Sequence, residues 1–245
     1  MDHEHGGHSG MWVPDEAPTW GRMFQVHLDS WSVLAVLSLV GLALYLVAVV
    51  RLRRTGVHWQ WWRTASWVAG TLSIFAVTGT WLNGYSMVLF SVHMSQHMIL
   101  SLITPLLLLI AAPVTLALRT LPRGRGAAGV PRALLLNGLH SRLARFLAHP
   151  LFSIPLFLAS LYGVYFTPLF DALMSSPAGH QLMLAHFVVT GILFFGPIVA
   201  QDPWPRTLSH PGRVLELFLP VPFHAFFGVA IMMAGSLVVD TFAQP

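Results

Sequence analysis

The sequence contains no cysteine and no lysine, and it is poor in charge of either sign. Without cysteine the chain has no disulfide, no thiolate metal site and no Cys-x-x-Cys redox centre. Only 9% of its residues are charged, whereas a soluble domain carries about 25%. Hydrophobic residues make up 55%, and the mean hydropathy is +0.67. The composition therefore indicates an integral membrane protein in which a metal site must use His, Met and carboxylate ligands.

Six apolar stretches are long enough to be membrane spans, since about 20 residues cross a bilayer as a helix. They cover residues 31–50, 65–82, 87–118, 151–169, 181–200 and 214–239. The third is too long for one straight span, and we expect Pro105 and Pro113 to kink or end it. A seventh span would exist if residues 134–147 were re-entrant, but the arginines of that stretch favour an amphipathic surface helix. The sequence thus predicts an all-α polytopic transmembrane helix bundle with six, or at most seven, spans.

The arginines set the expected orientation of these spans. Twelve of the thirteen basic residues fall in the connections on one side of the six spans, and only Arg22 falls on the other. The positive-inside rule places that side in the cytoplasm and both termini outside. We therefore expect two regions, a His-rich extracytoplasmic tail at 1–30 and a transmembrane helical domain at 31–240. Because the arginines flank apolar spans rather than one polar face, no nucleic-acid partner is expected.

The hexapeptide His-Met-Ser-Gln-His-Met at residues 93–98 lies inside the third apolar stretch. On a helix, His93 and His97 share one flank, and Met94 and Met98 form the neighbouring stripe. Polar groups in a membrane segment are costly unless they have a partner. A partner that suits both imidazole nitrogen and thioether sulfur is a transition metal, copper above all.

A second group of soft ligands is expected at matching depth. A rise of about 1.5 Å per residue places His93 and His97 roughly 8 and 14 Å below the outer surface. His180, Met183 and His186 begin the fifth span on the same side, and Met232 and Met233 return there in the sixth. The competing interpretation is histidine that is hydrogen-bonded within the bundle and methionine that fills gaps. The polar residues Ser91, Ser95 and Gln96 are candidates for orienting the imidazoles.

Two further histidines stand apart from this outer group. His224 follows Pro220 and Pro222 at greater depth, where it is either a second ligand site or a histidine bonded to carbonyls freed by the prolines. The N-terminus reads Met-Asp-His-Glu-His. Its amine, two amide nitrogens and His3 can form the square-planar set that Cu(II) prefers. His-rich tails also bind metals loosely without a specific role.

These residues resemble the multi-spanning bacterial CtaG-type cytochrome c oxidase assembly proteins. Four pieces match, in this order along the chain. The first is the hexapeptide at 93–98 with Pro105, and the second is Ala-Pro-Val-Thr-Leu-Ala-Leu-Arg at 112–119. The third is His180 and the segment from His186 to Gly191 with Asp202-Pro203, and the fourth is Pro-Phe-His-Ala-Phe-Phe-Gly at 222–228. The resemblance implies a multi-pass protein of the bacterial plasma membrane, with seven spans in many members. It also implies a role in maturing the oxidase by supplying copper to its buried copper–haem centre.

The leading hypothesis is a copper-binding assembly factor that catalyses no reaction. It would hold Cu(I) near the outer face with His93, His97, His186 and nearby methionines, and pass it to an oxidase subunit or another copper-handling protein. The first alternative is a copper permease with His224 as a deeper station. The second is a b-type cytochrome with haem between facing histidines. The oligomeric state is left open.

Overall fold

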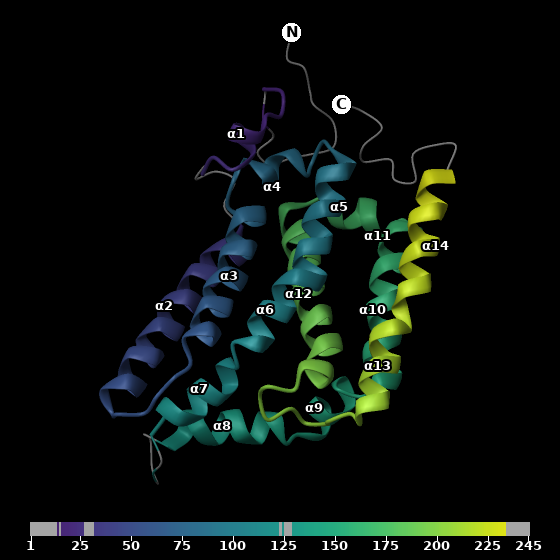
Figure 1. Cartoon of the computed structure of the whole chain (residues 1–245). Coiled ribbons are helices and arrows are strands. Elements are labelled where there is room, and N and C mark those ends of the chain that lie inside the picture. The colour runs from purple at the N-terminus through teal and green to yellow at the C-terminus, as the bar shows by residue number, and fades with distance from the viewer. Residues whose placement is uncertain (1–13, 15, 27–31, 123, 125–128, 234–245) are drawn as a thin grey trace.

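The computed structural model describes residues 14, 16–26, 32–122, 124 and 129–233. Within those residues the chain is helical, and the one extended pairing is an isolated bridge between Val26 and Thr80. The all-α prediction is therefore confirmed. Figure 1 shows long helices standing side by side, joined at both ends by short helices. Four helical stretches are long and apolar enough to cross a membrane: Val33–Arg54, Phe90–Thr120, Pro177–Val199 and His210–Met233.

The first helices are the short α1 (Trp20–Met23), α2 (Val33–Arg54), α3 (Trp61–Thr78) and the short α4 (Trp81–Tyr85). Ser32 starts α2, because its side chain accepts a hydrogen bond from the backbone N–H of Ala35. Arginines occupy the last turn of α2, where positive charge interacts favourably with the helix dipole. Helix α3, at the place of the second expected span, has 18 residues and is less apolar than the four stretches named above.

The third stretch is bent where the prolines predict. It consists of α5 (Phe90–Met98), a π-helical segment η2 (Ile99–Ile103), α6 (Thr104–Ile110) and α7 (Pro113–Thr120). Pro105 has no backbone N–H, and its ring crowds the carbonyl of Ser101, so the turn before it widens into a π-helix. Ala112 adopts a left-handed conformation with φ 50°, which ends α6 before Pro113 starts α7. The expected break at Pro113 is confirmed.

Two short helices, α8 (Val130–Leu139) and α9 (Arg142–Leu147), occupy the stretch for which a seventh span was considered. Figure 1 shows α8 running across one end of the bundle, at a steep angle to the long helices. Neither helix has a buried residue. This arrangement matches the surface-helix interpretation of residues 134–147. We call this side the arginine-rich end, because the arginines of the last turns of α2 and α7 also lie there.

The second half contains α10 (Pro150–Tyr165), the short α11 (Leu169–Met174), α12 (Pro177–Val199) and the consecutive α13 (His210–Phe218) and α14 (Pro220–Met233). Helix α10 is apolar but has only 16 residues. In Figure 1, α12 stands at the centre, with α10 and α14 on one side and α5 and α6 on the other. The main buried cluster joins α3, η2, α10, α11, α12 and α14, and partly buried residues of α5 pack against it.

Candidate metal centre

His93 on α5 and His180 on α12 lie near one another at the end of the bundle opposite the arginines. Their ring centroids are 6.3 Å apart, and both side chains are buried, at 1% and 2% exposure. The Phe170 ring meets the His93 ring edge-on at 5.1 Å. The His93 ring also interacts with the backbone of Ser86. The two helices thus bring together two imidazoles that lie 87 positions apart in the sequence.

The start of α12 explains why His180 points into the bundle. Ser176 caps the helix by accepting a hydrogen bond from the Gly179 N–H, and Pro177 fills the first turn. His180 follows in that same first turn, on the buried side. Its Nε2 atom is buried and has no hydrogen-bond partner among the described residues. A buried imidazole nitrogen without a hydrogen-bond partner costs free energy. A ligand that binds this nitrogen would therefore stabilise the protein.

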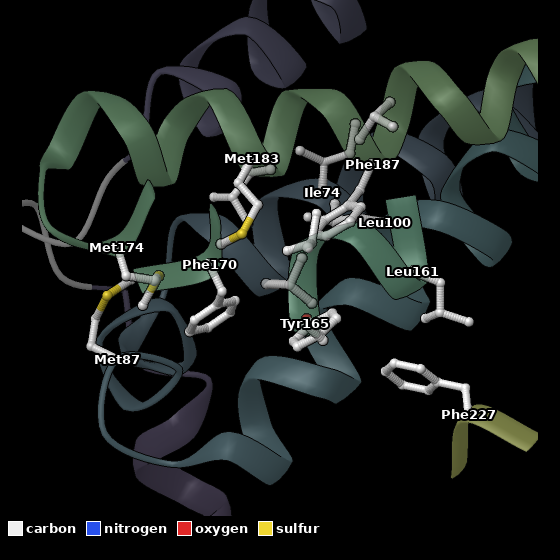
Figure 2. Close-up of a cluster of buried hydrophobic side chains, with 14 residues drawn as sticks. Ile74, Met87, Leu100, Leu161, Tyr165, Phe170, Met174, Met183, Phe187 and Phe227 are labelled. Carbon is white, nitrogen blue, oxygen red and sulfur yellow. The ribbon is translucent and has the colours of Figure 1, made fainter. Parts of the chain in front are cut away.

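Three buried methionines lie in the hydrophobic cluster whose Phe170 ring contacts His93. Met87, Met174 and Met183 have at most 2% exposure, and all three pack in the hydrophobic cluster that contains Phe170. Figure 2 shows the sulfur atoms of Met87 and Met174 facing one another, and the Met183 thioether extending toward Phe170. The cluster that borders His93 therefore contains thioether sulfur from the segment before α5, from α11 and from α12.

The methionines expected from the hexapeptide lie farther from the core of this centre. Met94 is partly buried and packs against the cluster, while Met98 is half-buried. Met232 and Met233 are 85% and 79% exposed, so they face away from the bundle. Met174 was not predicted, because it belongs to a short helix between two apolar stretches, where no spacing pattern marks it.

His97 has a different environment from His93. Its Nδ1 lies 3.1 Å from the hydroxyl of Tyr165. Its ring stacks on Phe187 at 3.6 Å and lies parallel to Tyr165 at 5.6 Å. These two aromatic rings fix the orientation of the imidazole.

The two deeper histidines are held by hydrogen bonds within the protein. His186 Nε2 lies 2.8 Å from Ser160 Oγ on α10. His224 Nδ1 lies 3.1 Å from the Pro220 carbonyl one turn earlier in its own helix, which is the carbonyl-bonding alternative considered for it. In the described part of the chain, no three side chains of the His, Cys, Asp or Glu types are grouped closely enough to hold one metal ion. His3 lies outside the described residues, so the copper prediction for the tail stays a prediction.

The hydrogen bonds of Gln96 join α5 to neighbouring segments, whereas that of Ser95 stays within α5. Gln96 donates hydrogen bonds to the Val77 carbonyl at 2.6 Å and to Asn83 Oδ1 at 3.1 Å. Ser95 donates to the Ser91 carbonyl within α5. Gln96 thus fastens α5 to the end of α3 and to α4, which fixes the depth at which His93 enters the cluster.

One buried acid was missed by the sequence analysis. Glu216 on α13 has 3% exposure, and its Oε1 accepts a 3.4 Å hydrogen bond from Ser153 on α10. Its other oxygen has no partner among the described residues. The available signal was a carboxylate inside the sixth apolar stretch, 214–239, where an ionisable residue is a functional candidate by default.

Two of the motif pieces meet at the arginine-rich end. Asp202, which follows α12, is buried against the start of α7. Its carboxylate accepts hydrogen bonds from the backbone N–H of Val114 at 3.2 Å, and from the N–H and hydroxyl of Thr115 at 2.7 and 2.6 Å. A carboxylate at a helix N-terminus satisfies free N–H groups and interacts favourably with the helix dipole. Asp202 therefore caps α7 from a distant part of the chain.

The histidine pair and the Asp202 cap thus lie at opposite ends of one bundle, and both consist of residues from the recognised motif pieces. A family model described as "Cytochrome c oxidase caa3 assembly factor (Caa3_CtaG)" matches residues 43–245. The chain belongs to this family. The match covers the whole described bundle except α1 and the first part of α2. It therefore includes both the histidine pair and the Asp202 cap.

Mycobacterial relatives of this Caa3_CtaG member are longer proteins. The chain is 42% identical over 231 residues to the uncharacterized protein Mb0105 of Mycobacterium bovis. The aligned residues make up 93% of this chain and 34% of that protein. It is 41% identical over 199 residues to the uncharacterized protein ML1998 of Mycobacterium leprae, or 81% of this chain and 30% of that one. The chain thus spans about a third of the length of the curated relatives it matches. No solved structure matches it.

Proposed function

We propose that this protein helps to mature cytochrome c oxidase by holding Cu(I) between His93 and His180, with thioether sulfur nearby, for delivery to the copper centre of the enzyme. The observation that carries the proposal is the buried imidazole pair, whose His180 Nε2 has no hydrogen-bond partner among the described residues. Copper is cargo here, and no bond is made or broken in a substrate. The family of assembly factors supplies the destination.

The spacing of the pair supports a metal with few ligands. A metal ion bound at about 2.0–2.1 Å by two imidazoles on opposite sides places the ring centroids roughly 6 Å apart. The observed separation is 6.3 Å. Cu(I) favours neutral imidazole and thioether ligands, and the three buried methionines supply the thioethers. The apolar surroundings favour a cation of single charge over a divalent one, because desolvation penalises the higher charge.

The topology we propose has six spans with both termini outside, at the places of α2, α3, α5–α7, α10, α12 and α13–α14. The arginine-rich end then faces the cytoplasm of a bacterial plasma membrane. The His93–His180 pair lies toward the outer face, where an oxidase subunit or another copper-handling protein receives the ion. Four apolar helical stretches, and the arginines in the last turns of α2 and α7 at one end of the bundle, support this arrangement.

The test is a Cu(I) titration of the protein purified in detergent, in competition with a coloured Cu(I) chelator. We expect one tightly held Cu(I) per chain, lost in His93→Ala and in His180→Ala. The matched control is His140→Ala, an exposed histidine that directly follows α8 and is bonded to the Leu136 carbonyl of that helix. Unchanged copper in both core variants, with thermal unfolding like that of the parent, would overturn the metal role of the pair.

Two further measurements separate the alternatives. A Soret band in protein made with adequate haem would favour a cytochrome. In the structure, one ring nitrogen of His97 already contacts Tyr165, and one ring nitrogen of His186 contacts Ser160. Each of these histidines therefore has one nitrogen left for a haem iron. Copper uptake into proteoliposomes would favour a permease. Farther along α10, toward the arginine-rich end, the polar side chains are Ser160 and Ser153, and Ser153 lies beside Glu216. As ligands for a copper ion on its path, these side chains offer oxygen rather than sulfur.

A further inference from the structure

Glu216 is a buried carboxyl inside the last apolar stretch of the chain. The residue is 3% exposed, whereas its neighbours Leu215 and Leu217 on α13 are 67% and 44% exposed. Helix α13 begins at His210, at the same end of the bundle as α8 and α9 (Figure 1). A rise of about 1.5 Å per residue places Glu216 roughly 9 Å from that start. The carboxyl thus points into the bundle, a short distance from the arginine-rich end.

Glu216 has fewer partners than Asp202, the other buried acid of the described residues. The Asp202 carboxylate accepts hydrogen bonds from two backbone N–H groups and one hydroxyl of α7. Glu216 Oε1 accepts one, from the Ser153 hydroxyl at 3.4 Å, and Oε2 has no partner in the described part of the chain. A buried negative charge with so little compensation costs far more free energy than a neutral carboxyl.

No positive charge is paired with this carboxyl among the described residues. The elements around it are α12 and α14, which pack on α13, and α10, which supplies Ser153. Their basic side chains on this side of the bundle are His149 at the start of α10, His210 and Arg213 on α13, and His224 on α14. The Nε of Arg213 donates to the Leu208 carbonyl, and His149 and His224 each contact the backbone of their own helix. Helix α12 has no titratable side chain after His186, and the tyrosines of α10 lie at its far end.

An aromatic layer separates Glu216 from the outer half of the bundle. Phe157 follows Ser153 by one turn of α10, stacks on Phe194 of α12 at 4.5 Å and meets Phe195 edge-on at 6.2 Å. The same ring contacts His224 at 5.6 Å. These rings occupy the space between Ser153 and the deeper serine of α10 that contacts His186. The arginine-rich end is therefore the nearer side from which Glu216 can be reached.

We propose that Glu216 is a proton-binding site that exchanges its proton with the arginine-rich side of the membrane. Oε2 carries the proton, while Oε1 accepts the hydrogen bond from Ser153. Acids inside membrane segments recur as proton-exchange sites. A proton is favoured over a metal ion, because hard cations take several oxygen ligands and no three acidic or histidine side chains are grouped here in the described residues. The site is independent of the proposed copper centre.

The experiment is infrared spectroscopy of the full chain purified in detergent. We expect the carbonyl band of a protonated carboxylic acid at neutral pH, shifted in heavy water and absent from Glu216→Gln. Glutamine keeps the shape of the side chain and can accept the Ser153 hydrogen bond, so the variant should unfold at the parent temperature. The matched control is Glu16→Gln, a half-exposed acid paired with Arg22, which should keep the band. A missing band in the parent, or a band that Glu216→Gln retains, would overturn the proposal.

Labelling with dicyclohexylcarbodiimide tests the reactivity and the side of access. The O–H of a protonated carboxyl adds across one C=N bond of this apolar reagent, and the product rearranges to a stable N-acylurea of the summed mass. We expect one adduct per chain, at Glu216, formed severalfold more slowly in alkaline buffer. In proteoliposomes whose orientation is established by protease digestion, the yield should follow the pH on the arginine-rich side. A yield that follows the pH on the other side, or a bound copper count that falls in Glu216→Gln, would contradict the assignment.

Discussion

Replacing Gly191 with alanine should destabilise the bundle at the contact between α12 and η2. Gly191 faces the π-helical segment so closely that a Cβ atom would lie 2.3 Å from the Ser101 carbonyl oxygen and 2.5 Å from Pro105 Cγ. Ordinary carbon–oxygen contacts across packed helices are about 3.3–3.6 Å. Alanine therefore fits only if α12 and η2 separate by roughly 1 Å. Neither neighbour yields easily, since one is backbone and the other is a proline ring.

The magnitude follows from two opposing terms. Overpacking a close contact typically costs about 1–3 kcal/mol, and obstruction by backbone favours the upper part of that range. Alanine regains up to about 1 kcal/mol from its higher helix propensity. The net loss should therefore be about 1–2 kcal/mol. For a chain of this size, each kcal/mol lowers the melting temperature by roughly 2–4 °C.

The assay is thermal unfolding of the purified protein in one detergent, with Gly163→Ala as the control. Gly163 is also a helical glycine, on α10, and a Cβ there would meet nothing within 4 Å. That variant should be as stable as the parent or slightly more stable, so only Gly191→Ala should lower the melting temperature. Equal melting temperatures would refute the reasoning that α12 needs glycine to approach η2.

The remaining predictions use the same unfolding assay. Asp202→Asn should cost about 1–2 kcal/mol, because the neutral amide caps α7 less strongly than the carboxylate that now binds Thr115; an unchanged melting temperature would contradict the capping role. Tyr165→Phe should cost about 0.5–1.5 kcal/mol of stability through the lost hydrogen bond to His97. The copper stoichiometry should stay unchanged, and loss of copper would instead place His97 in the metal centre. Tyr45→Phe should cost about 1–3 kcal/mol, because two buried partners of its hydroxyl lose their hydrogen bond; a smaller loss would mean that water replaces it.

The helical framework could be read from composition and proline positions. Long apolar stretches, with arginines at their ends, have few alternatives to membrane helices, because lipid offers no partner for free backbone groups. The break at Pro113 follows from the missing N–H and the fixed φ of proline. The exact ends were less accurate: α10 begins at Pro150 and ends at Tyr165, four residues before the expected end, because Pro168 follows. The π-helical turn before Pro105 was not predicted.

The candidate centre was only half readable from the sequence. His93 and His97 share a helix face by simple periodicity, and this pairing suggested a common site. In the structure Tyr165 and Phe187 fix the ring of His97, while His93 lies beside His180 and also contacts Tyr165. Which residue of a helix meets which residue of another depends on rotation and offset between helices. No spacing within one helix contains that information.

The sequence by itself determined the membrane-spanning helical class, the family and the supply of soft nitrogen and sulfur ligands. These follow from local properties: hydropathy, charge placement and the chemistry of side chains present or missing. Only the tertiary structure decided that His180 is the neighbour of His93, that Met174 joins the cluster and that Asp202 caps α7. The reason is that each of these contacts joins segments far apart in the chain, and packing at Gly191 and the π-helical turn sets how those segments meet.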